Sequence, residues 1–266
     1  MDRALPWRWA LVTGASSGIG RAIAEQLAAD GVNVVLVARR TELLTALADD
    51  LSGRHGVRTE VLPADLADSS QRDAVEARLG AAKDPVDLLV NCAGGGLAGP
   101  LIAHPPRQRQ READLNCISV LRLCHAAAAA MVPRGRGTIL NVASGLGYFA
   151  FPGAAVYSAS KAFVLSLSAT LRYELRDTGV GVTVVSPGPT RTEGPDLAGL
   201  DLTGLPRFLL AEPDRVASVA LAAARAGKAL EQVNGWNAAM TAAHHVPDRL
   251  LQPVLARLFR HFTRPR

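Results

Sequence analysis

The stretch Trp9-Ala10-Leu11-Val12-Thr13-Gly14-Ala15-Ser16-Ser17-Gly18-Ile19-Gly20 decides the fold. An apolar run comes first, a cluster of glycines follows, and Ile23 and Leu27 then recur at helical spacing. This order predicts a strand, a turn and a helix over residues 19–29. Glycines at such a turn let the backbone approach a pyrophosphate, and the free N–H groups that open the helix attract its charge. The stretch therefore predicts a dinucleotide site, with candidate contacts at Gly14, Ser16, Ser17, Gly18, Ile19 and Gly20.

The same alternation of strand and helix continues along the chain. Further apolar runs lie at 32–37, 57–62, 86–90, 138–142, 182–185 and 232–236, and helical stretches lie at 41–51, 69–79, 115–131 and 159–175, with another helix starting at Pro213. Continuous apolar strands are buried on both faces, which is typical of a parallel sheet covered by helices on each side. We therefore expect an α/β protein with a single-domain Rossmann fold over residues 1–240, built on a doubly wound, mostly parallel seven-stranded sheet.

Composition narrows the class of protein. A chain of 266 residues with 48% apolar content fits one domain, and its apolar runs are too short to cross a bilayer. No signal-peptide pattern opens the sequence, so a cytoplasmic location is expected. Cys92, Cys117 and Cys124 lack zinc-type spacing, which predicts reduced core cysteines and no metal site. The net charge of +5 comes from dispersed arginines without a nucleic-acid motif, so nucleic acid is not an expected partner.

The end of the second expected strand indicates which dinucleotide is bound. A carboxylate that holds a free ribose 2′-hydroxyl normally follows the glycines by about twenty residues. Here the sequence reads Ala38-Arg39-Arg40, with no acid. Arg39 is placed to grip a 2′-phosphate, which favours NADP(H) as the cofactor. The alternative is a solvated arginine pair at the start of the next helix, and it applies above all to Arg40.

Tyr157 and Lys161 lie four residues apart in a stretch expected to be helical, and Ser144 lies upstream of them. On a helix this spacing puts both side chains on one face, where the ammonium favours the phenolate. A phenol with such a neighbour is able to pass a proton near neutral pH. The pair alone is weak evidence, because Tyr and Lys at this spacing also occur by chance on amphipathic surfaces.

Together, the glycine loop and the Tyr/Lys pair resemble the classical short-chain dehydrogenase/reductase family over about residues 8–240. The resemblance implies a catalytic tetrad of Asn116, Ser144, Tyr157 and Lys161. It also implies cofactor contacts at Tyr157 and Lys161, at Asp65 and Leu66, at Asn91, Ala93 and Gly94, and at Pro187, Gly188, Thr190 and Thr192, with Ser16 assisting at the 2′-phosphate. Cys92 replaces the second asparagine of the family's Asn-Asn-Ala-Gly motif.

The resemblance implies hydride transfer between NADPH and a ketone, with Tyr157 as proton donor and Ser144 as a second donor to the carbonyl oxygen. Lys161 lowers the pKa of Tyr157 and binds the nicotinamide ribose, and Asn116 holds a water that connects Lys161 to solvent. The expected function is therefore an NADPH-dependent carbonyl reductase, or the reverse alcohol dehydrogenase, with a small-molecule carbonyl or alcohol substrate. The alternatives are a non-catalytic dinucleotide-binding regulator or scaffold on the same fold, and a nucleotide-sugar epimerase.

Four segments outside the motifs also carry expectations. Residues 192–212 are rich in Gly, Pro and Leu, which suits a lid over an apolar or mid-sized substrate or else a passive connection. The helices at 115–131 and 159–175 are apolar on several faces, which favours a homodimer or homotetramer over the alternative that alanine is simply common in helices. The extension at 241–266 is a basic amphipathic segment that suits a membrane surface, an adjacent subunit or the protein's own core.

Overall fold

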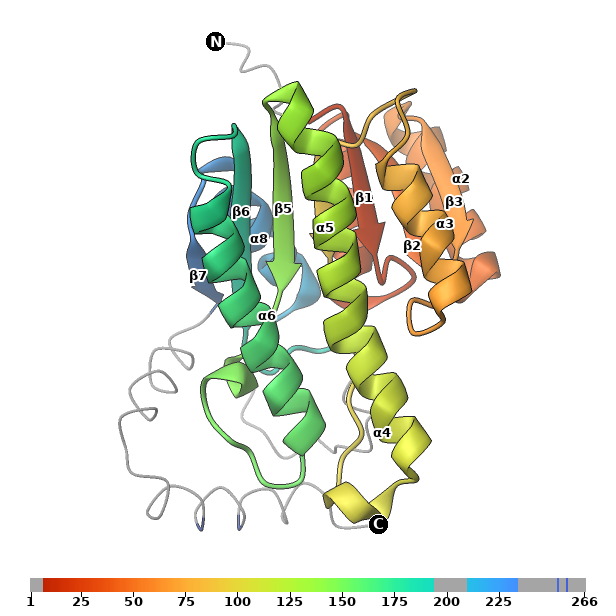
Figure 1. Ribbon diagram of the computed structural model, residues 1–266. Coiled ribbons are helices and arrows are strands. Elements are labelled where there is room, and N and C mark those ends of the chain that lie inside the picture. Colours follow the sequence, from red (N-terminus) through yellow and green to blue (C-terminus); the bar gives the residue numbers. More distant parts are fainter. Residues whose placement is uncertain (1–6, 194–209, 234–252, 254–256, 258–266) are drawn as a thin grey trace.

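The computed structural model describes residues 7–193, 210–233, 253 and 257. Its seven strands form one sheet in the order β3-β2-β1-β4-β5-β6-β7, and every neighbouring pair is parallel. The strands are β1 (Trp9–Thr13), β2 (Asn33–Ala38), β3 (Thr59–Pro63), β4 (Leu88–Asn91), β5 (Gly137–Val142), β6 (Val180–Pro187) and β7 (Leu230–Val233). The chain order reverses between β1 and β4, and ligands bind at such a switch point, outside the carboxyl ends of the strands. In Figure 1 this is the lower edge, to which the arrowheads of β1 and β5 point.

Helices cover both faces of the sheet. The longer ones are α1 (Gly18–Ala29), α2 (Thr41–His55), α3 (Ser69–Leu79), α4 (Pro106–Ala113), α5 (Ser119–Met131), α6 (Ala155–Glu174) and α8 (Pro213–Arg225). Short turns of helix lie at η1 (Leu101–Ala103), η3 (Val132–Arg134) and η4 (Gly145–Tyr148), and η2 (Asp114–Ile118) is a π-turn. Helices α1, α2 and α8 pack on one face, and α3, α5 and α6 pack on the other.

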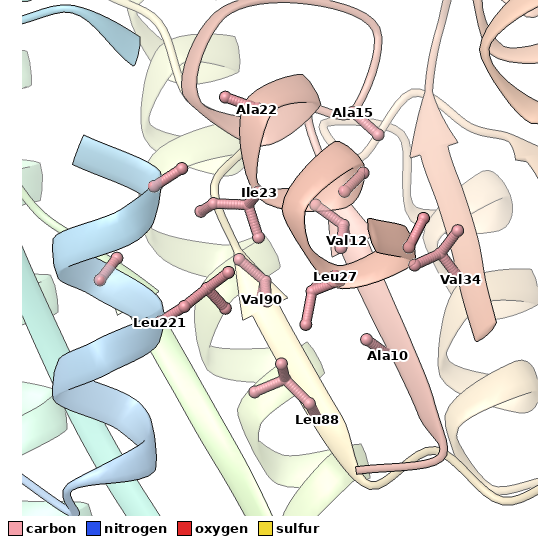
Figure 2. Close-up of a cluster of buried hydrophobic side chains, with 14 of the residues drawn as sticks. Ala10, Val12, Ala15, Ala22, Ile23, Leu27, Val34, Leu88, Val90 and Leu221 are labelled. Carbon is pink, nitrogen blue, oxygen red and sulfur yellow. The ribbon is translucent and has the colours of Figure 1, made fainter. Parts of the chain in front are cut away.

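Strand β1 shows why both faces are covered. Ala10 and Val12 are fully buried on the face of α1 and α8, whereas Trp9 and Leu11 are buried on the opposite face. Figure 2 shows the first cluster, in which Ile23 and Leu27 of α1 meet Val90 of β4 and Leu221 of α8. Burying one such side chain contributes about 1.5–3 kcal/mol, so alternate residues of a single strand stabilise two separate layers.

Helices α4 and α5 run on from each other through the π-turn (Figure 1). Within the described residues, this run at 106–134 is the one helix long and apolar enough, by length and composition, to cross a membrane. Its apolar side chains Val120, Leu123 and Met131 are buried against the sheet. Part of the apolar character of the run is thus used in the core of the domain, while Ile118, Leu121 and Val132 are exposed.

The expected doubly wound seven-stranded sheet is confirmed, and the described strands are all parallel. Helix 115–131 was expected to begin at its first apolar residues, but the helical run starts at Pro106. The added turns are polar in sequence and were therefore missed. The last strand, expected at 232–236, starts at Leu230 and is described up to Val233; residues 234–236 lie outside the described residues. The predicted lid at 192–212 and the extension at 241–266 fall mostly outside the described residues.

Candidate active site

The glycine loop is fastened to the end of β4 by Thr13. The buried hydroxyl of Thr13 accepts hydrogen bonds from the N–H groups of Cys92 and Ala93 at 2.9 and 3.0 Å and donates to the Val90 carbonyl at 3.1 Å. This brings together two segments that the sequence places more than seventy residues apart, since the bonds span |i−j| = 77 to 80. The predicted contacts at Gly14 and Ala93 thus lie at one switch point of the sheet.

The loop itself is too tight for side chains at its last glycine. A Cβ at Gly20 would overlap the backbone carbonyl of Gly14, so the turn between β1 and α1 closes only with glycine there. The first N–H groups of α1 have no partner within the helix, and they face the end of the loop with the positive end of the helix dipole. The chemistry of this cradle fits a pyrophosphate.

Arg40 lies beside the glycine loop. Its Nη2 and Nε atoms donate to Ser16 Oγ at 3.1 and 3.3 Å, and Nη1 pairs with Glu193 at 2.8 Å. Arg39 is exposed and makes no hydrogen bond or ion pair with any described residue. Arg40 is itself exposed, as the alternative of a solvated arginine expects, and it meets Ser16 and Glu193 at the surface. Both guanidinium groups lie at the end of β2, where a 2′-phosphate would be held.

Asp65 is held in place by three groups. Its carboxylate accepts from the Ala67 N–H at 3.1 Å and pairs with Arg111 of α4, and its own N–H donates to Gln71 at 2.8 Å. Leu66, next to it, is buried. The segment predicted to contact the cofactor is thus tied to α4, a link that the sequence did not reveal.

Asn91 turns its side chain into the sheet. Its Nδ2 donates to Asn141 Oδ1 at 2.9 Å, and Asn141 is its register partner on β5. Asn141 in turn donates to Ser168 of α6 at 2.9 Å, and all three residues are buried. Because buried polar groups are costly unless bonded, this chain of amides fixes β4, β5 and α6 against one another below the site.

Asn116 lies in the π-turn, where the extra residue widens the helix. Its Oδ1 accepts from the Gly95 N–H at 3.1 Å, and its Nδ2 donates to the Gly95 carbonyl at 2.7 Å and to Ser160 Oγ at 3.2 Å. Both N–H donors of the amide are used, so one lone pair on Oδ1 is left for a water. The side chain joins the loop after β4 to helix α6.

Tyr157 and Lys161 occupy successive turns of α6, as their spacing predicted. The Lys161 ammonium is buried, donates to the Val142 carbonyl at 3.0 Å and lies 5.6 Å from the centre of the Tyr157 ring. A Cβ at Gly94 would come within 3.2 Å of Asn116 Oδ1 and 3.3 Å of Lys161 Nζ, and a Cβ at Gly96 would touch the Tyr157 ring at 3.0 Å. Glycines after β4 therefore allow these side chains to converge.

Ser144 follows β5, two residues after the carbonyl that binds Lys161. Its hydroxyl caps the short helix η4 by accepting from the Leu146 N–H at 3.2 Å. Helix η4 packs against α6, which keeps Ser144 beside the helix that carries Tyr157. The predicted tetrad residues thus come from β5, the π-turn and α6 to one edge of the sheet.

The segment after β6 closes the opposite side of the site. Thr190 donates to the Gly188 carbonyl at 2.9 Å and forms a bridge with Ala211, and the Thr192 side chain lies against Gly18. A cleft of about 770 Å³ lies between the start of α1 and this segment, lined in part by Ser17, Gly18, Thr190, Thr192 and Glu193. The two ends of the predicted lid therefore meet next to the glycine loop.

The three cysteines are free thiols, as expected, but only Cys124 is buried as a core residue is, and Cys92 and Cys117 are half-buried. Burial raises the pKa of the Cys124 thiol to about 12, although hydrogen bonds with Asn141 and Asn91 oppose the rise. Burial also raises the pKa of Cys117, against the opposing charge of Lys161. Protonated thiols are poor nucleophiles, so these raised pKa values do not favour nucleophilic catalysis by Cys117 or Cys124.

A protein-family model described as short chain dehydrogenase matches residues 8–197. A sulfoacetaldehyde reductase from Chromohalobacter salexigens is 41% identical over 184 residues, which cover 68% of this chain and 72% of that protein. The aligned region covers 15% of the length of one curated relative and 73% of another.

Two solved structures are also similar over nearly the whole chain. A short-chain dehydrogenase from Sphingobium yanoikuyae in complex with NADPH is 36% identical, with a TM-score of 0.81 over 96% of this chain and 94% of that one. A bulky-bulky ketone specific alcohol dehydrogenase from Comamonas testosteroni is 31% identical, with a TM-score of 0.77 over 96% of this chain and 93% of that one.

Proposed function

Because the chain belongs to the short-chain dehydrogenase family of oxidoreductases, we propose that it interconverts a ketone and a secondary alcohol with NADP(H) as cofactor. The observation that carries the proposal is the convergence of Asn116, Tyr157 and Lys161 around the glycines after β4, beside the glycine loop. NADPH is supported by Arg39 and Arg40 at the end of β2 and by the NADPH complex of the Sphingobium relative.

The residues present fit a bound dinucleotide. The cradle between Gly14 and Gly20 would hold the pyrophosphate, the arginine pair the 2′-phosphate, and Thr190 and Thr192 the nicotinamide end. When bound, the reduced nicotinamide supplies the hydride for the carbonyl carbon. The protein's own task is then to stabilise the charge that builds on the carbonyl oxygen.

Tyr157 and Ser144 are the donors for that oxygen. The Tyr157 hydroxyl gives its proton to the forming alkoxide, while the Ser144 hydroxyl donates a hydrogen bond to the same atom. The resulting phenolate is stabilised by the buried Lys161 ammonium on the next turn of α6. In the oxidative direction the phenolate takes the proton from the alcohol.

For the substrate we propose an apolar or mid-sized ketone. The support is the apolar segment that follows Thr192 in the sequence and the bulky ketones named for the Comamonas relative. We also propose that the chain works as a homo-oligomer, supported by the small exposed side chains on the outer face of α6.

Replacing Tyr157 by phenylalanine tests the mechanism. Loss of the proton donor should lower kcat by about 10²–10⁴-fold, because general acid catalysis contributes that much. NADPH affinity, measured by fluorescence titration, should stay at the wild-type value. Turnover is measured as NADPH oxidation with a panel of ketones.

Tyr173→Phe is the matched control, because Tyr173 is exposed at the far end of the same helix. It should retain full activity. Full activity of Tyr157→Phe would contradict the mechanism. A wild-type protein that binds NADPH but reduces no carbonyl of the panel would instead support the regulator or scaffold.

A further inference from the structure

Helix α4 carries a buried ion pair that the catalytic scheme does not use. Arg109 and Glu112 are each 7% exposed, and Nη1 of Arg109 lies 3.1 Å from Oε2 of Glu112. Burial raises the pKa of the Glu112 carboxyl above its ordinary value, and the Arg109 guanidinium beside it opposes that rise. Buried charges are costly unless their remaining donors and acceptors are satisfied, so this pair needs further hydrogen-bond partners.

Those contacts all go to the loop that follows β4. Arg109 donates to four consecutive or nearly consecutive carbonyls, those of Leu97 at 2.7 Å, Gly99 at 3.1 Å, Pro100 at 3.1 Å and Leu101 at 3.4 Å. The second carboxylate oxygen of Glu112 accepts from the Leu97 N–H at 3.4 Å. A planar guanidinium with five fixed donors is suited to binding several carbonyls at once, and a lysine is not.

The other side of the same loop faces the catalytic residues. Gly95 exchanges two hydrogen bonds with the amide of Asn116, and Gly96 lies against the ring of Tyr157. The Gly99 N–H donates to the Gly153 carbonyl at 2.9 Å, which ties the loop to the segment between Ser144 and Tyr157. The loop at 95–101 is therefore held between the ion pair and the proton donor.

We propose that Arg109 and Glu112 are positioning residues, which fix the loop at 95–101 as a preformed wall of the carbonyl substrate's site beside Tyr157. The inference rests on the proposed function and deepens it, because it assigns the placement of the substrate to a pair that acts through the loop it binds. A wall set in advance holds the carbonyl near the Tyr157 hydroxyl without ordering the loop at each turnover.

A purely structural role predicts a different kinetic pattern from a positioning role. If the pair only stabilises the domain, its removal lowers the melting temperature or the active fraction, and the KM for ketone stays constant. If the pair positions the substrate, its removal raises the KM for ketone and leaves the affinity for NADPH unchanged. The pair contacts the loop at 95–101 and not the glycine loop. We therefore expect a raised KM for ketone and an unchanged affinity for NADPH.

The test uses the double variant Arg109→Gln/Glu112→Gln, which leaves no unpaired buried charge; it keeps the volume of the glutamate and shortens the arginine by two heavy atoms. We expect kcat/KM for the best ketone of the panel to fall by about 10²-fold, mainly through KM, since a displacement of about 1 Å can cost that much. Hydrogen exchange of peptides covering 95–101 should become faster in the full-length protein, with exchange in β4 unchanged. The single variant Arg109→Lys keeps the positive charge but replaces the planar guanidinium by an ammonium group. We expect its kcat/KM to lie between the values of the double variant and the wild type.

Arg107→Gln is the matched control, because Arg107 is exposed on the same helix two residues away. It should leave both KM and loop exchange at wild-type values. An unchanged KM in the double variant, or loop exchange equal to that of wild type, would overturn the proposal. A wild-type protein that reduces no ketone would contradict the proposed function itself. The substrate-positioning role of the pair would then fall for that separate reason.

Discussion

Arg39 and Arg40 are both candidates for binding the 2′-phosphate of the proposed cofactor. Arg40 is already organised, because it bonds Ser16 and Glu193, whereas Arg39 has no partner among the described residues. The pair of Arg40 with Glu193 is exposed, so the free energy that holds it is small, about 0–1 kcal/mol. A 2′-phosphate can therefore take the place of Glu193 on this guanidinium at little cost.

Replacing either arginine by alanine should weaken NADPH more than NADH. A hydrogen bond to a charged group contributes about 1.5–3 kcal/mol, so we expect the Kd for NADPH to rise by about 10- to 100-fold and the Kd for NADH to change little. Fluorescence titration of Arg39→Ala and Arg40→Ala measures both. Arg54→Ala, an exposed arginine of α2, is the control. Equal weakening of NADH and NADPH would contradict the assignment of the 2′-phosphate to this pair.

At the residue scale, contacts between residues close in sequence could be predicted from their spacing. Contacts between residues far apart in sequence could not. Tyr157 and Lys161 are four residues apart, so their shared helix face was predictable. The partners of Arg40 lie at |i−j| = 24 and 153, and those of Arg109 lie in a loop with no recognisable motif. Arg111, which pairs with Asp65 at |i−j| = 46, was missed for the same reason.

At the scale of elements, the turn that leads into β6 packs closely against the turn that leads into the neighbouring strand β5. Gly179 joins α6 to β6 with a φ of +78°, and Gly135 precedes β5 with a φ of +64°. A Cβ at Gly179 would overlap the carbonyl of Gly135, whereas a Cβ at Gly135 would meet nothing within 4 Å. The two glycines share a backbone conformation and differ only in the space around them.

Gly179→Ala should therefore destabilise the protein far more than Gly135→Ala. The left-handed conformation costs alanine about 1 kcal/mol at both positions, and overpacking adds about 1–3 kcal/mol at Gly179 alone. Denaturant unfolding should give losses of about 2–4 kcal/mol for Gly179→Ala and about 1 kcal/mol for Gly135→Ala. Equal losses at the two sites would show that the turns do not pack as described.

Elements were predictable where burial leaves a pattern. Strands β1, β2 and β4 are buried along nearly their whole length, so their apolar runs stood out, and α3 was predicted at its observed bounds, Ser69–Leu79. Helix α4 was missed because its inward side chains are Arg109 and Glu112, whose burial depends on carbonyls that no local pattern encodes. A helix with charged residues on its buried side lacks the apolar periodicity by which a helix is recognised in a sequence.

At the scale of the whole molecule, α5 and α6 lie on the same face of the sheet and turn a side to the outside (Figure 1). On α6 that side consists of small residues, among them Ala159, Ala162 and Ser166, all exposed. Leu121 of α5 is 41% exposed. A helix face of small side chains is what a second copy of the chain needs for close helix packing.

We predict that the protein forms a homodimer or homotetramer through this face, with a mass two or four times that of the 27.9 kDa chain. Light scattering after size exclusion measures the mass directly. Ala162→Glu places a charge in the interface, which is costly when desolvated, and should shift the protein to smaller species. Ala46→Glu, exposed on α2 at the opposite face, is the control and should leave the mass unchanged. A monomeric wild type, or an unchanged mass in Ala162→Glu, would contradict the prediction, because the outer face of α6 would then be an ordinary solvated surface.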